Sequence, residues 1–188
     1  MKQKEKIFFK EYTEKYINHL HDSTLIFNKL IKIKENLIQV KKNKSKVLIF
    51  GNGGSAAIAS HFSVDLVKNT NIRCLNFNEA DILTCFSNDY GYEKWVSKAI
   101  DFYADKKDLI IFISSSGKSK NMLNGVSSAK RKKISKIITL TGGLKNNPLS
   151  KKGKINLWVN SKIYNHIENV HQFWLLSICD SIKLNKLK

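Results

Sequence analysis

The chain has few acidic residues, few cysteines and no long apolar segment. It holds 15 Asp and Glu residues against 33 Lys and Arg, which gives a formal net charge of +18 at pH 7. No apolar run approaches the roughly 20 residues that a membrane-spanning helix needs. The three cysteines, Cys74, Cys85 and Cys179, lack the spacing of metal ligands. We therefore expect no membrane span, and we expect the cysteines to be small buried residues of a reduced, cytoplasmic protein.

The N-terminal segment carries lysines but has neither an uninterrupted apolar stretch nor a small-residue cleavage site, so we expect no signal peptide. Nothing in the sequence resembles an internal repeat or a long linker. With 188 residues, of which 42% are hydrophobic, the chain is long enough for one domain with a full core. We expect residues 1–188 to form that domain.

The excess of positive charge has two interpretations. It indicates either a surface that binds nucleic acid or membranes, or a general richness in lysine. The lysines are spread along the chain, apart from the cluster Lys130-Arg131-Lys132-Lys133. We favour the second interpretation and expect neither a nucleic acid nor a membrane as partner. A basic surface would also steer an anionic sugar phosphate toward the protein.

Two segments near the N-terminus show helical spacing of their apolar residues. Residues 3–20 have a stripe close to i, i+4, and residues 25–40 have their apolar residues on one face. Each predicted helix leaves an apolar stripe to bury. These stripes either cover the sheet or pair with another copy of the chain, and both outcomes stay open.

Further along, short apolar runs alternate with segments of helical spacing. The predicted strands are residues 47–50, 72–77, 108–113, 134–140 and 157–159. One predicted helix follows Ser55, and another runs through Met122, Val126 and Ala129. Further helices are predicted at residues 80–86, 92–103 and 165–184, with a polar turn at residues 87–91. Strands that alternate with helices predict a three-layer α/β fold around a parallel sheet.

The first predicted strand runs into Gly51-Asn52-Gly53-Gly54-Ser55. Glycines allow positive φ and a close approach of backbone to a ligand, and we expect Ser55 to cap the following helix. Free N–H groups and the positive end of a helix dipole would then meet, which is typical of a phosphate site. The segment lacks the third glycine of a dinucleotide-binding motif and the lysine of a Walker A loop. The alternative is an ordinary strand-to-helix turn.

Serines follow the strand predicted at residues 108–113. Ser114, Ser115, Ser116 and Ser119 surround Gly117 just ahead of a predicted helix. Hydroxyls and helix N-terminal amides form a neutral cradle for a phosphate without a metal. Alone, such a segment is usually only a loop. In an open parallel sheet, however, both loops lie at the carboxyl ends of their strands, where ligands bind, so we predict one shared phosphate site.

Several motifs in combination resemble one family. They are Gly51 to Ala57 with His61-Phe62, Ser87-Asn88-Asp89-Tyr90-Gly91, Ser114 to Ser119, and Leu140-Thr141-Gly142. In this combination the chain resembles the sedoheptulose-7-phosphate (phosphoheptose) isomerases of the sugar isomerase (SIS) domain superfamily. The resemblance covers nearly the whole chain.

This resemblance implies a flavodoxin-like SIS domain with five parallel strands. Residues 1–43 would be N-terminal helices for oligomer packing, and residues 46–188 the α/β core. It also implies a cytoplasmic homotetramer with sites between subunits. The implied reaction is aldose–ketose isomerisation of a phosphorylated sugar, from ketose to aldose heptose phosphate, for lipopolysaccharide or capsule precursors.

The family's motifs assign roles to residues of this chain. The glycine turn would lie at the sugar, the Asn-Asp pair would contact the sugar while also forming a turn, and the serines would bind the phosphate. The implied substrate-binding residues are Asn52, Gly53, Gly54, Ser55, Asn88, Asp89, Ser114, Ser115, Ser116, Ser119 and Glu168.

The family resembles zinc enzymes in which a His and a Glu, four apart on one helix, act with a Gln and a His on the last helix. Here His61 and Asp65 keep that spacing, although Asp65 is one methylene shorter than Glu. On the last helix Glu168 replaces the glutamine, and Leu176 replaces the histidine and can neither carry a proton nor bind a metal. We expect Asp65 and Glu168 to be the catalytic acid/base pair. A zinc ion held by His61, Asp65 and Glu168 stays open.

His171 also has two interpretations. It lies three residues after Glu168, so the two side chains roughly share a helix face. Together with His61 and Asp65 they would form a two-His, two-carboxylate set suited to a divalent metal. The family has a histidine at this position that is not its usual ligand, so we favour a structural role.

Two other functions remain as alternatives to the isomerase. The first is a non-catalytic SIS domain that binds a phosphosugar or associates with a replication initiator, which Leu176 and the basic surface favour. The second is a SIS-type enzyme or sensor for a different sugar phosphate, such as an amino sugar.

Overall fold

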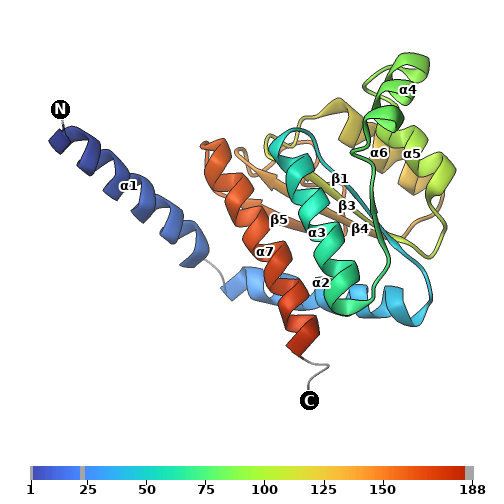
Figure 1. Ribbon diagram of the computed structural model, residues 1–188, viewed down its shortest axis with the longest axis horizontal. Helices are drawn as coiled ribbons and strands as arrows, with labels where there is room; N and C mark the ends of the chain where they lie inside the picture. Colours follow the sequence, from blue (N-terminus) through green and yellow to red (C-terminus); the bar gives the residue numbers. More distant parts are fainter. Residues whose placement is uncertain (1, 22–23, 185–188) are drawn as a thin grey trace.

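The computed structural model of the chain describes residues 2–21 and 24–184. The elements within them are, in order, α1 (Lys2–His21), α2 (Thr24–Lys42), β1 (Val47–Phe50), α3 (Gly54–Thr70), β2 (Cys74–Asn76), α4 (Ala80–Tyr90), α5 (Trp95–Tyr103), β3 (Leu109–Ser114), α6 (Lys120–Arg131), β4 (Lys136–Gly142), β5 (Ile155–Val159) and α7 (Tyr164–Leu184). Figure 1 shows their arrangement.

The strands form a five-stranded sheet in the order β2-β1-β3-β4-β5, and every neighbouring pair is parallel. This confirms the predicted fold class. From β1 the chain first adds β2 on one side and then β3 on the other, so the strand order switches between β1 and β3. Open α/β sheets bind ligands at such a switch point. Phe50 of β1 pairs with Phe112 of β3, so the loops that follow these two strands start side by side.

Both faces of the sheet are covered, because β1 and β3 are apolar on both sides and fully buried. On one face α3 and α7 lie next to each other, and Phe62 and Trp174 belong to the same buried cluster as Ile49. On the other face α5 and α6 pack together, and Trp95 and Met122 join the cluster around Phe112.

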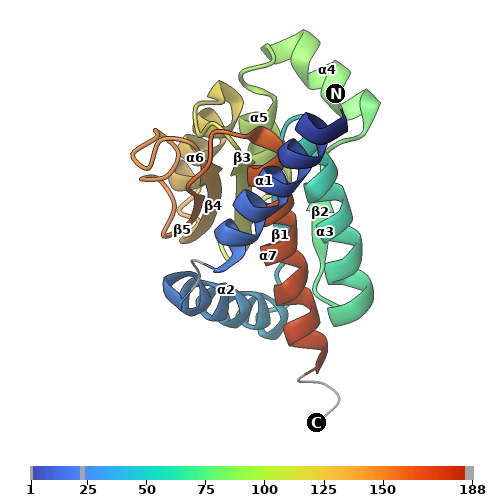
Figure 2. The same ribbon diagram turned by 90° about the vertical axis from the view of Figure 1, so that its left-hand side faces the viewer.

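The two N-terminal helices differ in what they pack against. The apolar stripe of α2 is buried through Ile33, Leu37 and Val40, and α2 contacts α7, β5 and β3. α1 projects away from the sheet (Figures 1 and 2), with Phe8 and Phe9 exposed. The sequence left open whether these helices cover the sheet or pair with another copy of the chain. α2 covers the sheet, whereas α1 leaves much of its apolar surface uncovered.

Two predictions fail around α4. The polar turn expected at residues 87–91 is the last part of α4, which ends where Gly91, at φ 86°, donates its amide to the Ser87 carbonyl. Polar residues indicated a turn here because α4 is a surface helix without a buried residue. For the same reason Cys85 is exposed, against expectation, whereas Cys74 and Cys179 are buried as predicted.

Other boundaries shift by a few residues: β2 covers only Cys74–Asn76, and α5 begins at Trp95 rather than at residue 92. Among the described residues, no helix combines the length and the apolarity that crossing a bilayer requires.

Candidate active site

The loop after β1 is a tight turn that begins α3 two residues earlier than predicted. Gly53, with φ 54° and ψ −125°, is the N-cap, and α3 starts at Gly54. The expectation that Ser55 caps the helix is wrong, because glycine takes the positive φ that this turn needs. Ser55 is buried in the first turn and donates its amide to the Asn52 carbonyl at 3.0 Å, and Ala56 donates to Gly53 at 2.9 Å. Fewer amides are thus free here than the sequence indicated.

The loop after β3 retains more free hydrogen-bonding capacity. We call Ser114 to Ser119 the serine cradle. Its turn is closed by the Gly117 amide on the Ser114 carbonyl at 2.9 Å, with Gly117 at φ 64°. The hydroxyls of Ser114 and Ser119 lie 3.0 Å apart, and Ser119 caps α6 without a side-chain bond to the helix. The first-turn amides of α6 have no carbonyl within the helix, so they and the helix dipole favour an anion here.

The end of β4 and the segment between β4 and β5 support the serine cradle. Leu149 donates its amide to the Gly117 carbonyl at 3.0 Å, and Gly142 donates to the Ser115 carbonyl at 3.0 Å. The buried Asn147 side chain packs so closely on Gly117 that a Cβ there would overlap it. The conformation of the cradle is therefore fixed by neighbours from the next strand.

Both loops open on one cavity of about 200 Å³, which we call the cradle cavity. It brings together residues of three elements that are distant in sequence. Its lining is Asn52, Ser55, Ile113, Ser114, Ser115, Ser116, Ser119, Tyr164 and Glu168. Seven of these nine are predicted substrate-binding residues. The structure thus gathers the predicted phosphate loops and the first turns of α7 at the carboxyl ends of β1 and β3.

Glu168 of α7 points into the cradle cavity. Its Oε1 lies 3.5 Å from the hydroxyl of Ser115, which donates to it. Its carboxylate also lies against Gly54, where a Cβ would collide with it. Because Gly54 is the first residue of α3, the carboxylate sits at the positive end of that helix dipole. A half-buried carboxylate thus lies beside a site suited to phosphate.

A side-chain network that the sequence did not indicate orients Asn52. Asn52 and Asn121 exchange two amide hydrogen bonds of 3.1 and 2.9 Å, and the Tyr92 hydroxyl donates to Asn52 Oδ1 at 3.1 Å. Asn121 is in the first turn of α6, and its place just after the serine cradle was a usable signal. Tyr92 and Tyr164 carried none, because only the folded chain brings them here.

The His61–Asp65 pair lies farther along α3. His61 Nε2 is 3.6 Å from Asp65 Oδ2, as the i, i+4 spacing predicts. Gln172 of α7 donates from Nε2 to His61 Nδ1 at 3.2 Å, which places the proton of neutral His61 on Nε2, toward Asp65. Gln172 was missed by sequence reasoning. Its position four residues after Glu168 puts both on the face of α7 that meets α3.

Comparison with known proteins assigns the family. A profile of the SIS domain matches residues 11–142. The phosphoheptose isomerase of Helicobacter pylori (strain ATCC 700392 / 26695) is 35% identical over 155 residues, which cover 78% of this chain and 79% of that protein. The phosphoheptose isomerase of Aliarcobacter butzleri (strain RM4018) is 38% identical over 153 residues, which cover 77% and 79%. The chain belongs to the phosphoheptose isomerase family of SIS domain proteins.

A solved structure agrees with this assignment, and a second one shares the fold. Phosphoheptose isomerase GmhA from Neisseria gonorrhoeae superposes with a TM-score of 0.85 at 26% identity, over 95% of this chain and 98% of that one. A phosphoheptose isomerase from Francisella tularensis shares the fold with a TM-score of 0.83, at 24% identity and 97% coverage of both chains. The SIS domain match ends at Gly142, so α7, with Glu168 and Gln172, lies beyond it.

This family member does not assemble the predicted metal ligands within one chain. At 1.5 Å per residue, Asp65 lies about 16 Å along α3 from Gly54, which Glu168 touches. In the part of the chain that the structure describes, no three His, Cys, Asp or Glu side chains are grouped to hold a metal ion. Of the predicted metal ligands, only His61 and Asp65 lie close enough to each other to bind one metal ion within a single chain.

His171 has the structural role that the sequence favoured. It is fully buried, and its Nε2 lies 3.1 Å from the Thr141 carbonyl, to which it donates. Burial lowers the pKa of His171 to about 4, so the ring is neutral near pH 7. The alternative set of His61, Asp65, Glu168 and His171 is wrong, because the position of His171 on α7 directs its ring into the core rather than toward α3.

Asn88 and Asp89 lie away from the cradle cavity. They are exposed on α4, and Asn88 Nδ2 donates to Asp89 Oδ1 at 3.0 Å. α4 stands over α5 at the far side of the molecule from α1 (Figure 1). Leu176 is half-buried two helical turns after Glu168. Within one chain, these residues do not join the cradle cavity.

Proposed function

We propose that this SIS domain protein is an aldose–ketose isomerase of a phosphorylated sugar, of the kind that interconverts sedoheptulose 7-phosphate and an aldose heptose phosphate. The names of its relatives support this reaction class. The observation that carries the proposal is the Glu168 carboxylate, 3.5 Å from a hydroxyl of the serine cradle. A base and a phosphate anchor in one small cavity are the two parts that this reaction requires.

Phosphate binding fixes the sugar in this proposal. The phosphoryl group accepts hydrogen bonds from the serine hydroxyls and from the first-turn amides of α6. Asn52 is held by Asn121 and Tyr92, and the second hydrogen of its Nδ2 is left to donate to a sugar hydroxyl. Because the bound sugar is already held next to the base, the proton transfer becomes effectively unimolecular, which lowers the entropic part of the barrier.

Glu168 then moves the proton between carbons. Its carboxylate removes the proton from the carbon next to the carbonyl, which gives an enediol, and returns it to the adjacent carbon. A second proton must pass between the two oxygens. In this proposal the proton is relayed by the Ser115 hydroxyl, which contacts Glu168, and by Tyr164, which lines the same cavity.

The predicted role of Asp65 as the partner of Glu168 requires a second copy of the chain in this proposal, because Asp65 lies too far along α3. A homotetramer with sites between subunits is supported by two surfaces. α1 exposes Phe8 and Phe9, and a groove of about 670 Å³ between α2 and α7 is lined by apolar residues such as Phe27, Ile31 and Phe173. Assembly would also bring Asn88 and Asp89 of one copy toward a neighbouring cavity.

Zinc, a cytoplasmic location and a place in lipopolysaccharide or capsule precursor synthesis stay predictions of the family resemblance. A zinc ion would draw on His61 and Asp65, and it would supply a positive charge that stabilises an oxyanion. Elemental analysis of the purified protein, compared with the H61A variant, measures whether the pair binds it. Light scattering measures the mass of the assembly.

The isomerase proposal is tested by steady-state assays with sedoheptulose 7-phosphate. Glu168→Gln keeps size and polarity but removes the base, so turnover is expected to fall about 10³-fold with KM changed less than threefold. Exchange of the substrate C–H proton with D₂O, followed by NMR, should vanish in the same variant. Asp180→Asn, at an exposed carboxylate on the same helix, is the matched control and should keep full turnover.

The Asp65→Asn variant distinguishes two mechanisms, one with Asp65 and Glu168 as an acid/base pair and one with Glu168 as the single base. A loss similar to that of Glu168→Gln supports the pair, whereas a loss below tenfold assigns the proton transfer to Glu168 alone. Wild-type protein that binds sedoheptulose 7-phosphate without turning it over would overturn the isomerase. It would favour the non-catalytic SIS domain, for which the replacement of the family's histidine by Leu176 is the supporting observation.

A further inference from the structure

A second, larger cavity adjoins the serine cradle at the carboxyl ends of β3, β4 and β5. Its volume is about 630 Å³, within the range of small-molecule sites. It shares Ser115, Ser116 and Tyr164 with the cradle cavity, so the two spaces are neighbours across the same loop. The proposed isomerase reaction takes place on the other side of the cradle, toward Glu168 and Gly54, and leaves this space unused.

Three lysines line this space, which we call the lysine cavity. Lys118 follows Gly117 of the serine cradle, Lys145 comes from the segment between β4 and β5, and Lys162 precedes α7. All three are exposed, and none of the described residues that line the cavity is acidic. In the ion pairs found among residues 2–21 and 24–184, none of these lysines takes part. The lining of the cavity therefore carries an excess of positive charge, and the nearby Glu168 carboxylate lies across Ser115 in the cradle cavity.

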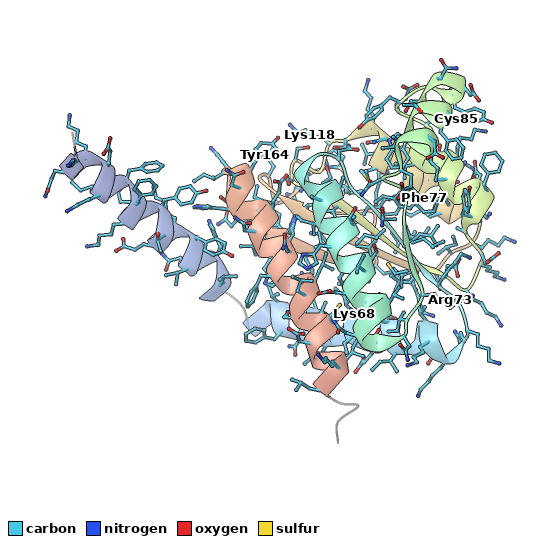
Figure 3. The ribbon with its side chains drawn as sticks, viewed as in Figure 1. Lys68, Arg73, Phe77, Cys85, Lys118 and Tyr164 are labelled. Carbon is cyan, nitrogen blue, oxygen red and sulfur yellow. The ribbon has the colours of Figure 1, made fainter. Side chains whose placement is uncertain are left out.

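Backbone and aromatic groups add to this environment. α7 begins at Tyr164, so its positive helix end faces the lysine cavity, just as the first turn of α6 faces the serine cradle. Figure 3 shows Lys118 and Tyr164 at this end of the molecule. Trp158 is fixed by a 3.1 Å hydrogen bond from its Nε1 to the Gly143 carbonyl, and Lys145 Nζ lies 5.8 Å from its ring centre. The N-terminal ends of two helices, α6 and α7, thus lie near Ser115 and Ser116.

We propose that the lysine cavity takes the second phosphoryl group of a diphosphate whose first phosphoryl group lies in the serine cradle. A sugar monophosphate fills the cradle only, whereas the two linked phosphoryl groups of a diphosphate match two adjoining anion sites. Such a ligand excludes the phosphosugar from the cradle and inhibits the isomerase. The inference rests on the proposed function for the cradle. Inorganic pyrophosphate and a nucleoside diphosphate share the chemistry, and the volume leaves room for a nucleoside.

The test is isothermal titration of the full chain with inorganic phosphate, pyrophosphate, adenosine diphosphate and sedoheptulose 7-phosphate. Pyrophosphate is expected to bind at least tenfold more tightly than phosphate. The variant K118Q/K145Q/K162Q should lose this advantage. The matched control K106Q/K107Q/K154Q removes the same charge from exposed lysines at the amino ends of β3 and β5, and it should keep the advantage. A control that loses it equally would assign the effect to net charge and overturn the proposal.

The four ligands distinguish a nucleotide from free pyrophosphate as the natural diphosphate. They also test the diphosphate site and the isomerase separately. Tighter binding of adenosine diphosphate than of pyrophosphate indicates a nucleotide, and equal or weaker binding indicates free pyrophosphate. Pyrophosphate binding no tighter than phosphate, beside normal binding of sedoheptulose 7-phosphate, overturns the diphosphate site alone. A lysine-dependent pyrophosphate advantage without any binding of sedoheptulose 7-phosphate supports the diphosphate site and overturns the isomerase. Failure of every ligand to bind overturns both.

Discussion

The cradle cavity has two walls that are built in different ways. The loops after β1 and β3 present backbone and short hydroxyl side chains, held by hydrogen bonds within the turns and by Asn147. The wall formed by α7 presents Tyr164 and Glu168, and the Glu168 carboxylate is carried on a flexible stem. The first wall lies inside the SIS domain match and the second lies beyond it. In our proposal the loops bind the phosphate and α7 supplies the chemistry, so a family member can change its chemistry without rebuilding its anchor.

The largest effect expected from this comparison is on stability, and it concerns the wall formed by the loops after β1 and β3. Gly117→Ala places a Cβ against the buried Asn147 side chain at a positive φ, so it should lower the free energy of unfolding by about 3 kcal/mol. Gly143→Ala is the matched control, because Gly143 has a similar φ of 62° and an open space around its Cβ. It should cost about 1 kcal/mol. Urea unfolding measures both, and equal losses would show that Asn147 does not brace the cradle.

A smaller effect is expected where the two walls touch. Gly54→Ala should push the Glu168 carboxylate out of the cradle cavity, because a Cβ there meets the end of a flexible side chain rather than the backbone. We expect turnover of sedoheptulose 7-phosphate to fall about 30-fold, roughly 2 kcal/mol, with the unfolding midpoint nearly unchanged. In the Glu168→Gln background the same change should cost less than threefold. Full additivity of the two losses would contradict the contact.

The smallest effect concerns the buried side of α7. The pKa of His171 is about 4 in the folded chain against an ordinary value of 6.5, so below pH 6.5 the unfolded chain binds the proton first. Stability is therefore lost as the pH falls, by about 1.4 kcal/mol between pH 7.5 and 5.5. His171→Gln keeps a donor for the Thr141 carbonyl without titrating. Its stability should fall by about that much less over the same interval, as measured by urea unfolding at each pH.

The helices and strands were largely predictable, because their signals are local. The run Val47–Phe50 is the strand β1 with the predicted bounds, and the buried run before Ser114 is β3. The glycine turn was found, but its cap was misplaced, since both Gly53 and Ser55 satisfy the local rules for a helix start. The end of α4 was missed because a polar surface helix and a polar turn have similar composition.

The candidate site was predictable only in part. The serines and Asn52 could be named because a loop at the end of a buried strand is a recognisable pattern. Asn121, just after the serine cradle, could have been named from its position but was missed. Tyr92, Tyr164 and Gln172 could not, because each acts through a partner distant in sequence. The lysine cavity had no linear signal either, since its three lysines are among many in a chain of formal charge +18.

The sequence by itself determined the alternation of strands and helices, the two loops and the family, because these depend on neighbours within a few residues. Only the tertiary structure decided which groups share a cavity. It placed Glu168 beside Ser115 and Gly54, kept Asp65 about 16 Å away along α3, and turned His171 into the core. The physical reason is that the rotation and translation of α7 against α3 and the sheet follow from the packing of many apolar side chains at once.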